Sequence, residues 1–252
     1  MSRQSRRAME AVEAYLAESK LPWTILLFLL PAVLFYETRL AILAARGEAV
    51  LVNKAQHGVL RFLEAIGLGD AGLFALALPG AVLVGLLLLW QVLLRAPWRV
   101  APATLGIMLA ESAAMAAPLL LLSTIASGSP LAATEPDWSS LGVSARIAVS
   151  LGAGLYEELV FRLLLLATLH VVFVDLLGMK SWLGSTIAVL VAAILFAVYH
   201  PLRDGAGEID WRRAAFYVAA GAWLGGLMML RGFGITVGAH ALYDVATLLG
   251  SD

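Results

Sequence analysis

Long apolar runs separated by short polar segments cover most of the chain from about residue 21 onward. Most of them match the roughly 20 residues that a helix needs to cross the hydrocarbon core of a bilayer. The runs lie at 21–44, 73–94, 103–125, 144–170, 182–200, 212–230 and 234–249. Because a backbone in lipid must satisfy its own hydrogen bonds, each run predicts a helix. We therefore predict an all-α fold, a polytopic transmembrane helical bundle with about seven spans.

Two segments of mixed polarity predict further helices that lie along the membrane surface. Residues 1–20 place apolar side chains along one side of a helix whose other side is charged. Residues 46–70 show a similar amphipathic pattern, which is typical of an interfacial helix. We expect His57, in this second segment, to be an interfacial polar residue without a catalytic role.

An exposed loop is predicted over residues 126–142, where Pro130 and Pro136 are typical of irregular backbone. It separates an N-terminal membrane region, 1–142, from a C-terminal helical core, 143–252, that holds the candidate chemistry. The N-terminal region comprises the amphipathic N-terminal helix, three spans and the interfacial helix. Because no segment is long enough for a separate soluble core, we expect one integrated membrane domain.

The composition supports a membrane protein and excludes several other classes. Hydrophobic residues make up 61% of the 252 residues and charged residues only 14%, against about 25% in soluble domains. The net charge of -1 provides no basic surface, so we expect the lipid bilayer and no nucleic acid among the partners. The chain has no cysteine, which excludes disulfides, a thiolate nucleophile and cysteine-ligated zinc.

Three ionisable residues lie inside the fourth apolar run, in the sequence GAGLYEELVFR. Such groups are costly at bilayer depth and persist where they pair with each other or line a functional cavity. On a helix, Glu158 and Arg162 share a face and form an ion pair, whereas Glu157 points about 100° away. Gly152 and Gly154 are small enough to let another helix approach closely and cover the pair. A buried ion pair that only holds helices together is the alternative interpretation.

Two later runs add polar residues at helical spacing. The fifth run ends in ILFAVYHP, which places Phe196 and His200 on one face before Pro201 ends the helix. The seventh run begins GITVGAHALYD, which places His240 and Asp244 on one face. Each histidine alone is more often a packing residue. Two histidines together with a glutamate pair, all in apolar runs of the C-terminal part, favour a functional site.

These side chains are compatible with several kinds of chemistry. A glutamate and a histidine can remove a proton from water and pass it to a leaving amine, which is suitable for amide hydrolysis. Alternatively, Glu157, His200 and His240 could be three zinc ligands with one open position. A third interpretation is a proton-coupled transporter or a membrane scaffold that uses the buried groups. Glu111 is either a partner of this region or a packing residue.

The three motifs, EExxxR at 157–162, FxxxH at 196–200 and HxxxD/N at 240–244, occur in this order on successive helices. In this respect, residues 144–249 resemble the CPBP family, which comprises CAAX prenyl-protein endopeptidases and bacteriocin-processing, Abi-type intramembrane proteases. The resemblance implies an intramembrane endopeptidase of the glutamic type, without an obligatory metal or other cofactor. The N-terminal half matches no motif of the family.

The resemblance also implies a role for each motif residue. Glu157 is expected to be the catalytic base for water, and His200 to share the activation of that water. His240 and Asp244 are expected on the oxyanion side, although position 244 is asparagine in many members, and an ionised aspartate cannot donate a hydrogen bond. Glu158, with Arg162, corresponds to the structural pair of the first motif.

The expected substrate is a membrane-anchored or lipid-associated protein or peptide. The composition, rich in Ala, Leu, Gly and Arg and poor in Lys, favours a bacterial source, so we expect the bacterial inner membrane. There the family resemblance implies maturation of bacteriocins, signalling peptides or C-terminally anchored surface proteins.

Straight helices that each cross the whole membrane would place His200 and His240 at opposite membrane faces. His200 ends its run, and His240 lies near the start of a run with the same direction. We therefore predict that the fifth membrane helix stops partway through the membrane at Pro201 and that residues 201–211 line a water-filled cavity.

Overall fold

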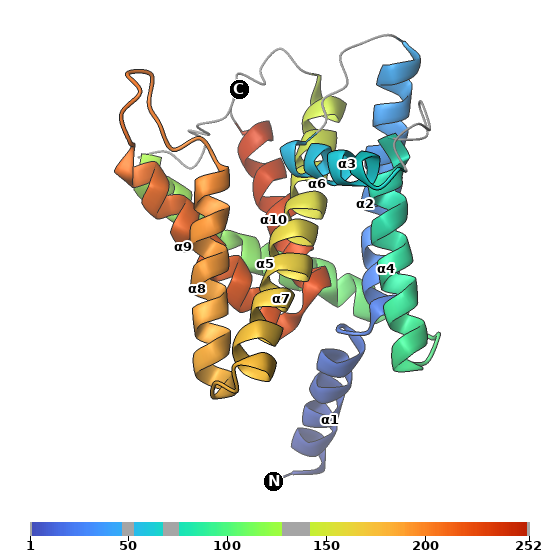
Figure 1. The fold of residues 1–252 in the computed structure, drawn as a ribbon. Helices are drawn as coiled ribbons and strands as arrows, with labels where there is room; N and C mark the ends of the chain where they lie inside the picture. Colours follow the sequence, from blue (N-terminus) through green and yellow to red (C-terminus); the bar gives the residue numbers. More distant parts are fainter. Residues whose placement is uncertain (1, 47–52, 68–75, 128–141, 251–252) are drawn as a thin grey trace.

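The computed structural model describes residues 2–46, 53–67, 76–127 and 142–250 (Figure 1). The described residues are almost entirely helical, which confirms the all-α prediction. The α-helices are α1 (Arg3–Glu18), α2 (Pro22–Ala45), α3 (Lys54–Ala65), α4 (Leu78–Leu94), α5 (Pro102–Ser127), α6 (Val143–Glu158), α7 (Ala167–His170), α8 (Ser181–Tyr199), α9 (Trp211–Arg231) and α10 (Phe233–Leu249). Two π-helical stretches, η3 (Leu159–Leu166) and η4 (Val171–Leu176), alternate with α7, so that α6 continues as one helical rod to residue 176.

Five helices of the described part are long and apolar enough to cross a membrane. They are α2, α5, the rod that starts with α6, α8 and α9, and α4 and α10 are shorter apolar helices. The protein is therefore an integral membrane protein, and each predicted span corresponds to one of these helices. The start of the span predicted over 73–94 and most of the loop predicted over 126–142 lie outside the described residues. The division into two regions at residue 142 stays a prediction.

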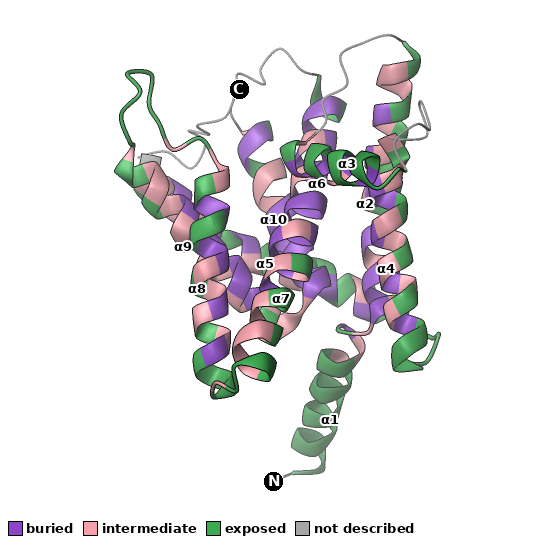
Figure 2. Ribbon diagram, in the orientation of Figure 1, coloured by how far each residue is buried: buried purple, intermediate pink, exposed green. Residues whose placement is uncertain are grey.

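The inner helices of the bundle are α6 and α10, which pack against each other along much of their length. Figure 2 shows buried residues concentrated on these helices and on the sides of their neighbours that face inward, whereas α1 has no buried residue. A Cβ atom on Gly154 would lie 2.7–2.9 Å from Ala241 of α10, and one on Gly152 would lie 2.4 Å from the Tyr36 ring of α2. The predicted close approach at these glycines is confirmed.

The connection between α8 and α9 differs from its prediction. Helix α8 ends at Tyr199, as predicted, but residues 201–211 are mostly exposed and extend beyond the ends of the two helices (Figure 1). The turn satisfies its own backbone, because the Asp204 carboxylate accepts hydrogen bonds from the N–H groups of Ala206 and Glu208. The prediction that this loop lines a water-filled cavity at membrane depth is wrong, because the loop extends outside the bundle, where a self-satisfied polar turn is stable in water.

Candidate active site

The two adjacent glutamates end α6, at the point where the helix widens into the π-helical stretch η3. Helical segments of π type are rare and often occur at functional sites. Glu158 is fully buried, with 0% exposure, and its Oε1 atom lies 2.9 Å from Nη1 of Arg162. The Arg162 guanidinium also lies 4.2 Å from the centre of the Phe196 ring. Glu158 and Arg162 thus form the predicted ion pair, and the Phe196 ring from α8 packs against the guanidinium.

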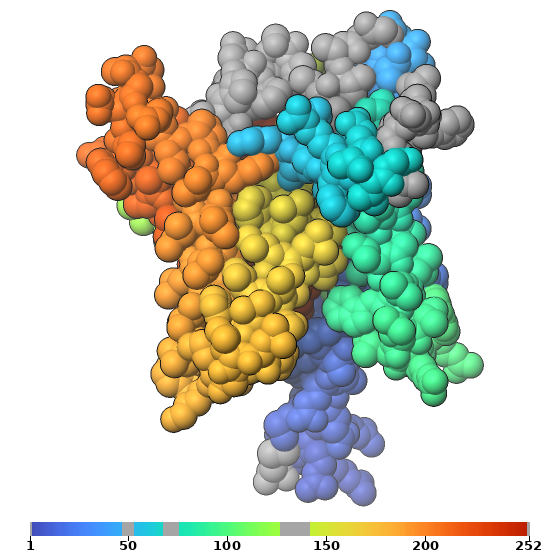
Figure 3. All heavy atoms as spheres, viewed as in Figure 1, coloured from blue at the N-terminus to red at the C-terminus, as the bar shows by residue number. Residues whose placement is uncertain are grey.

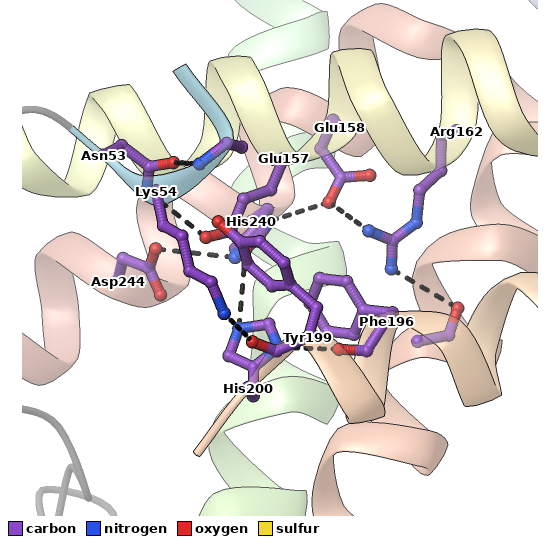
Figure 4. Close-up of polar contacts among 12 residues, drawn as sticks. Asn53, Lys54, Glu157, Glu158, Arg162, Phe196, Tyr199, His200, His240 and Asp244 are labelled. Atoms are coloured by element: carbon purple, nitrogen blue, oxygen red, sulfur yellow. Dashed lines mark hydrogen bonds and ion pairs between the residues drawn. The ribbon is translucent and has the colours of Figure 1, made fainter. Parts of the chain in front are cut away.

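His240 reaches the same carboxylate from α10. Its Nδ1 atom lies 2.7 Å from Oε1 of Glu158, and its Nε2 atom lies 3.5 Å from Oδ2 of Asp244 (Figure 4). The close backbone approach at Gly154 allows this contact between α6 and α10. Because a carboxylate only accepts hydrogen bonds, Nδ1 carries a hydrogen, and the ring presents Nε2 toward Asp244.

His200 follows the last residue of α8 and lies close to Glu157. Its Nδ1 atom lies 2.8 Å from the backbone oxygen of Phe196, which can only accept, so Nδ1 donates this hydrogen bond. Nε2 then lies 3.6 Å from Oε2 of Glu157, which is 6% exposed. The Tyr217 ring from α9 stacks on the imidazole, with centroids 4.1 Å apart and planes at 23°. The hydrogen bond to α8 and the stacking ring from α9 together set the ring orientation of His200.

The structure resolves the conflict of depth between the two histidines. His200 comes directly after the end of α8, whereas His240 lies near the middle of α10. Figure 1 shows that α10 starts higher in the bundle than α8. This offset brings both imidazoles to the level of the glutamates at the end of α6, without an irregular segment in the cavity.

Two residues from the N-terminal region complete this cluster, and the sequence pattern did not reveal them. Helix α3 lies across the α6 rod, beside α4 (Figure 3). The Asn53 amide donates from Nδ2 to Oε1 of Glu157 over 3.3 Å, and Lys54 donates from Nζ to the backbone oxygen of Tyr199 over 2.6 Å (Figure 4). The amphipathic pattern predicted α3 itself, but no spacing rule links position 53 to position 157. His57, on the same helix, is exposed, as expected for an interfacial residue.

Glu111 lies outside this cluster. Both of its carboxylate oxygens accept hydrogen bonds from Arg231 at the end of α9, and Tyr15 of α1 donates to the same carboxylate. Of the two roles left open for Glu111, the packing role is the one that the structure shows.

The zinc alternative needs three ligands arranged around one ion. Within the described residues, no group of three or more histidine, aspartate or glutamate side chains is arranged to hold a metal ion. Nδ1 of His240 is directed at Glu158 and Nδ1 of His200 at a backbone oxygen, which leaves Nε2 of each ring for one further partner. A mechanism without a metal therefore stays a prediction.

Residues 139–246 match a family model described as Rce1-like, type II CAAX prenyl endopeptidase Rce1-like. The match supports the resemblance of the C-terminal part of the chain to the CPBP family. No curated protein and no solved structure matches the chain significantly. The matched region contains every motif residue described above, whereas α1 to α5 lie before it. The match to this protease family, together with the apolar helices, supports an intramembrane endopeptidase.

Proposed function

We propose that this protein hydrolyses a peptide bond in a membrane-anchored or lipid-associated protein or peptide, with Glu157 as the base that activates water. One observation carries the proposal: Glu157 from α6 and His200 from α8 meet at 3.6 Å inside an apolar bundle. In the part of the chain that the structure describes, neither Nε2 of His200 nor Oε2 of Glu157 makes a hydrogen bond shorter than this contact. Both groups therefore retain the capacity to bind a reactant.

The geometry supports a water molecule held by both groups. With Nδ1 protonated, neutral His200 presents a lone pair at Nε2, and Glu157 presents lone pairs at Oε2, so one water can donate a hydrogen to each. Glu157 takes one proton as the water oxygen attacks the carbonyl carbon of the scissile bond, which gives a tetrahedral intermediate. The proton then passes to the leaving amine as the carbon–nitrogen bond breaks, which regenerates the carboxylate.

The negative oxygen of the tetrahedral intermediate needs a hydrogen-bond donor. His240 fits this role, because its Nδ1 donates to Glu158 and the 3.5 Å between its Nε2 and Oδ2 of Asp244 leaves the N–H at Nε2 available to a closer acceptor. Between two carboxylates, only a doubly protonated ring can donate from both nitrogens. Asp244 accepts rather than donates when it is ionised, so we assign it the orientation of His240. Glu158 and Arg162 form the structural pair below the ring.

We propose a mechanism without an obligatory metal ion, in the bacterial inner membrane, with a peptide or C-terminally anchored surface protein as substrate. The glutamic-type mechanism needs only the carboxylate and the imidazoles. Chelators distinguish it from the zinc alternative.

The test is a cleavage assay with purified protein in detergent or liposomes. Candidate membrane-anchored peptides are incubated with the wild-type protein and with Glu157→Gln, each with and without 1,10-phenanthroline, and products are identified by mass spectrometry. We expect cleavage by the wild type that survives the chelator and is absent from the variant. Cleavage by Glu157→Gln would remove this residue from the mechanism, and loss with chelator would favour a metal. Proton-coupled transport without any cleavage would overturn the protease proposal.

A further inference from the structure

Asn53 makes two different hydrogen bonds with the two ends of its amide. As the residue that caps the N-terminus of α3, it accepts at Oδ1 from the backbone N–H of Ala55 over 2.7 Å. Its Nδ2 atom donates to Oε1 of Glu157 over 3.3 Å. The amide orientation follows from the first bond, because only the oxygen end can accept from a backbone N–H. The N-cap therefore directs the N–H₂ group at the candidate base.

The bond from Asn53 uses the carboxylate oxygen that does not face His200. Oε1 of Glu157 accepts from the amide, while Oε2 lies 3.6 Å from the imidazole. A hydrogen bond at one oxygen restricts the rotation of the carboxylate, and this restricts the direction of the lone pairs at the other oxygen. An amide N–H₂ group can only donate, and this stabilises the accepting, ionised form of Glu157.

The first turn of α3 is held close to Glu157 and His200, the two residues that would bind the proposed water. Lys54 donates to the backbone oxygen of Tyr199, the residue before His200, and its ammonium group lies 4.2 Å from the centre of the Tyr199 ring. Gln56 is fully buried and accepts a hydrogen bond from Tyr36 of α2. These contacts hold the cap of α3 against α8 and α2, so Asn53 has a defined position relative to Glu157.

We propose that Asn53 is a positioning residue that orients the Glu157 carboxylate, so that α3, from outside the matched region, completes the active site. This inference rests on the proposed function. It makes the N-terminal part of the chain a contributor to the chemistry as well as to the membrane anchor.

Substitutions that keep the cap separate the two bonds. Serine and aspartate cap helices about as well as asparagine does, but neither supplies an amide donor to Glu157. Asn53→Ser removes the donor, and Asn53→Asp replaces it with a second carboxylate near Glu157. The exposed His57→Ala, on the same helix, is the matched control.

The measurement is kcat and KM for a cleaved peptide, together with the melting temperature of each variant. We expect kcat to fall about 10- to 100-fold in Asn53→Ser, the range for a hydrogen bond to a charged group, and further in Asn53→Asp. KM should stay close to wild type, the melting temperature should decrease only slightly, and His57→Ala should keep its kcat. A kcat within twofold of wild type in both Asn53 variants, with Glu157→Gln inactive, would overturn the inference and leave the proposed function intact.

A thermal double-mutant cycle tests the contact without any activity. The melting temperatures of Asn53→Ser, Glu157→Ala and the double variant are compared with wild type, since residues in contact have non-additive effects. We expect the effect of Asn53→Ser to shrink when Glu157 is absent. Additive shifts would show that the amide does not act on Glu157, and this result would count against the inference whether or not a substrate is cleaved.

Discussion

Two clusters of charged side chains in the described part of this bundle, around Glu111 and around Glu157, differ in how many hydrogen bonds the glutamate accepts. Around Glu111, Arg231 approaches both carboxylate oxygens, at 2.5 and 2.8 Å, and Tyr15 adds a further donor. Around Glu157, the nearest described donor is the Asn53 amide, at 3.3 Å, and Nε2 of His200 lies 3.6 Å away. The first carboxylate is saturated by protein groups, and the second has capacity left for water or substrate.

The difference distinguishes a structural ion pair from the candidate catalytic site. Both clusters contain a glutamate and an arginine in apolar surroundings, so the presence of charge alone does not distinguish them. At Glu111, burial together with the neighbouring carboxylate raises the pKa of Tyr15 to about 12, so the phenol stays protonated and keeps donating at neutral pH. This cluster joins α1, α5 and α9. The alternative interpretation, an ion pair that only holds helices together, thus describes Glu111. Glu157 differs because its carboxylate can still accept hydrogen bonds.

The largest expected effect comes from neutralising each carboxylate in turn. Glu157→Gln should lower kcat by about 10² to 10⁴-fold, the usual contribution of a general base, and leave the fold intact. Glu111→Gln should keep kcat within about twofold, because this side chain touches no reacting group. Peptide cleavage and melting temperature, measured on both variants, check the contrast. Equal losses of activity in the two variants would contradict the proposed difference between Glu157 and Glu111.

Next in size is the removal of the arginine from each cluster. Arg162→Met leaves Glu158 buried without its cation and should cost about 3–5 kcal/mol of stability. Arg231→Met should cost less, because the Arg231 side chain is 13% exposed and Glu111 is 18% exposed, so water can replace the lost partner. Denaturant unfolding in mixed micelles measures both. A larger loss in Arg231→Met would mean that burial does not rank the two pairs.

A smaller effect is expected from the helix contact beneath the site. Gly154→Ala places a Cβ atom 2.7–2.9 Å from Ala241, so α6 and α10 must separate and draw His240 away from Glu158. We expect a stability loss of about 1–3 kcal/mol, typical of overpacking, with a parallel decrease in kcat. Gly85→Ala is the control, since a Cβ atom there would meet nothing within 4 Å. An unchanged kcat in Gly154→Ala would indicate that His240 tolerates the displacement.

The smallest effect should come from Tyr15→Phe, which removes one of the donors to Glu111 and keeps the Arg231 pair. We expect a loss of about 0.5–1.5 kcal/mol in the free energy of unfolding and no change in cleavage. Limited proteolysis of α1 offers a second readout, because α1 should detach more readily from the bundle. Protection equal to that of the wild type would show that Tyr15 does not hold α1.

The sequence was sufficient for the helices and for the spacing within each helix. The apolar runs predicted every span, and the i, i+4 rule predicted the contacts of Glu158 with Arg162 and of His240 with Asp244. Contacts between helices were not predictable in the same way, because they depend on helix offsets and crossing positions that no local pattern records. The Asn53 contact with Glu157 and the stacking of Tyr217 on His200 are of this kind. The prediction for residues 201–211 was wrong because their polar groups hydrogen-bond to one another and do not line a cavity.

The 24 residues of α2 separate the N-terminal helix from α3 and its capping asparagine. A helix of this length crosses the whole hydrocarbon layer, so α1 and α3 lie at opposite surfaces of the membrane. Asn53, the cap of α3, contacts Glu157, which lies on the α3 side of the bundle. In the proposed mechanism, hydrolysis would therefore be sided: whichever compartment receives the N-terminus, the cut peptide would emerge toward the other, and an epitope tag on residue 1 would report the compartment that the products avoid.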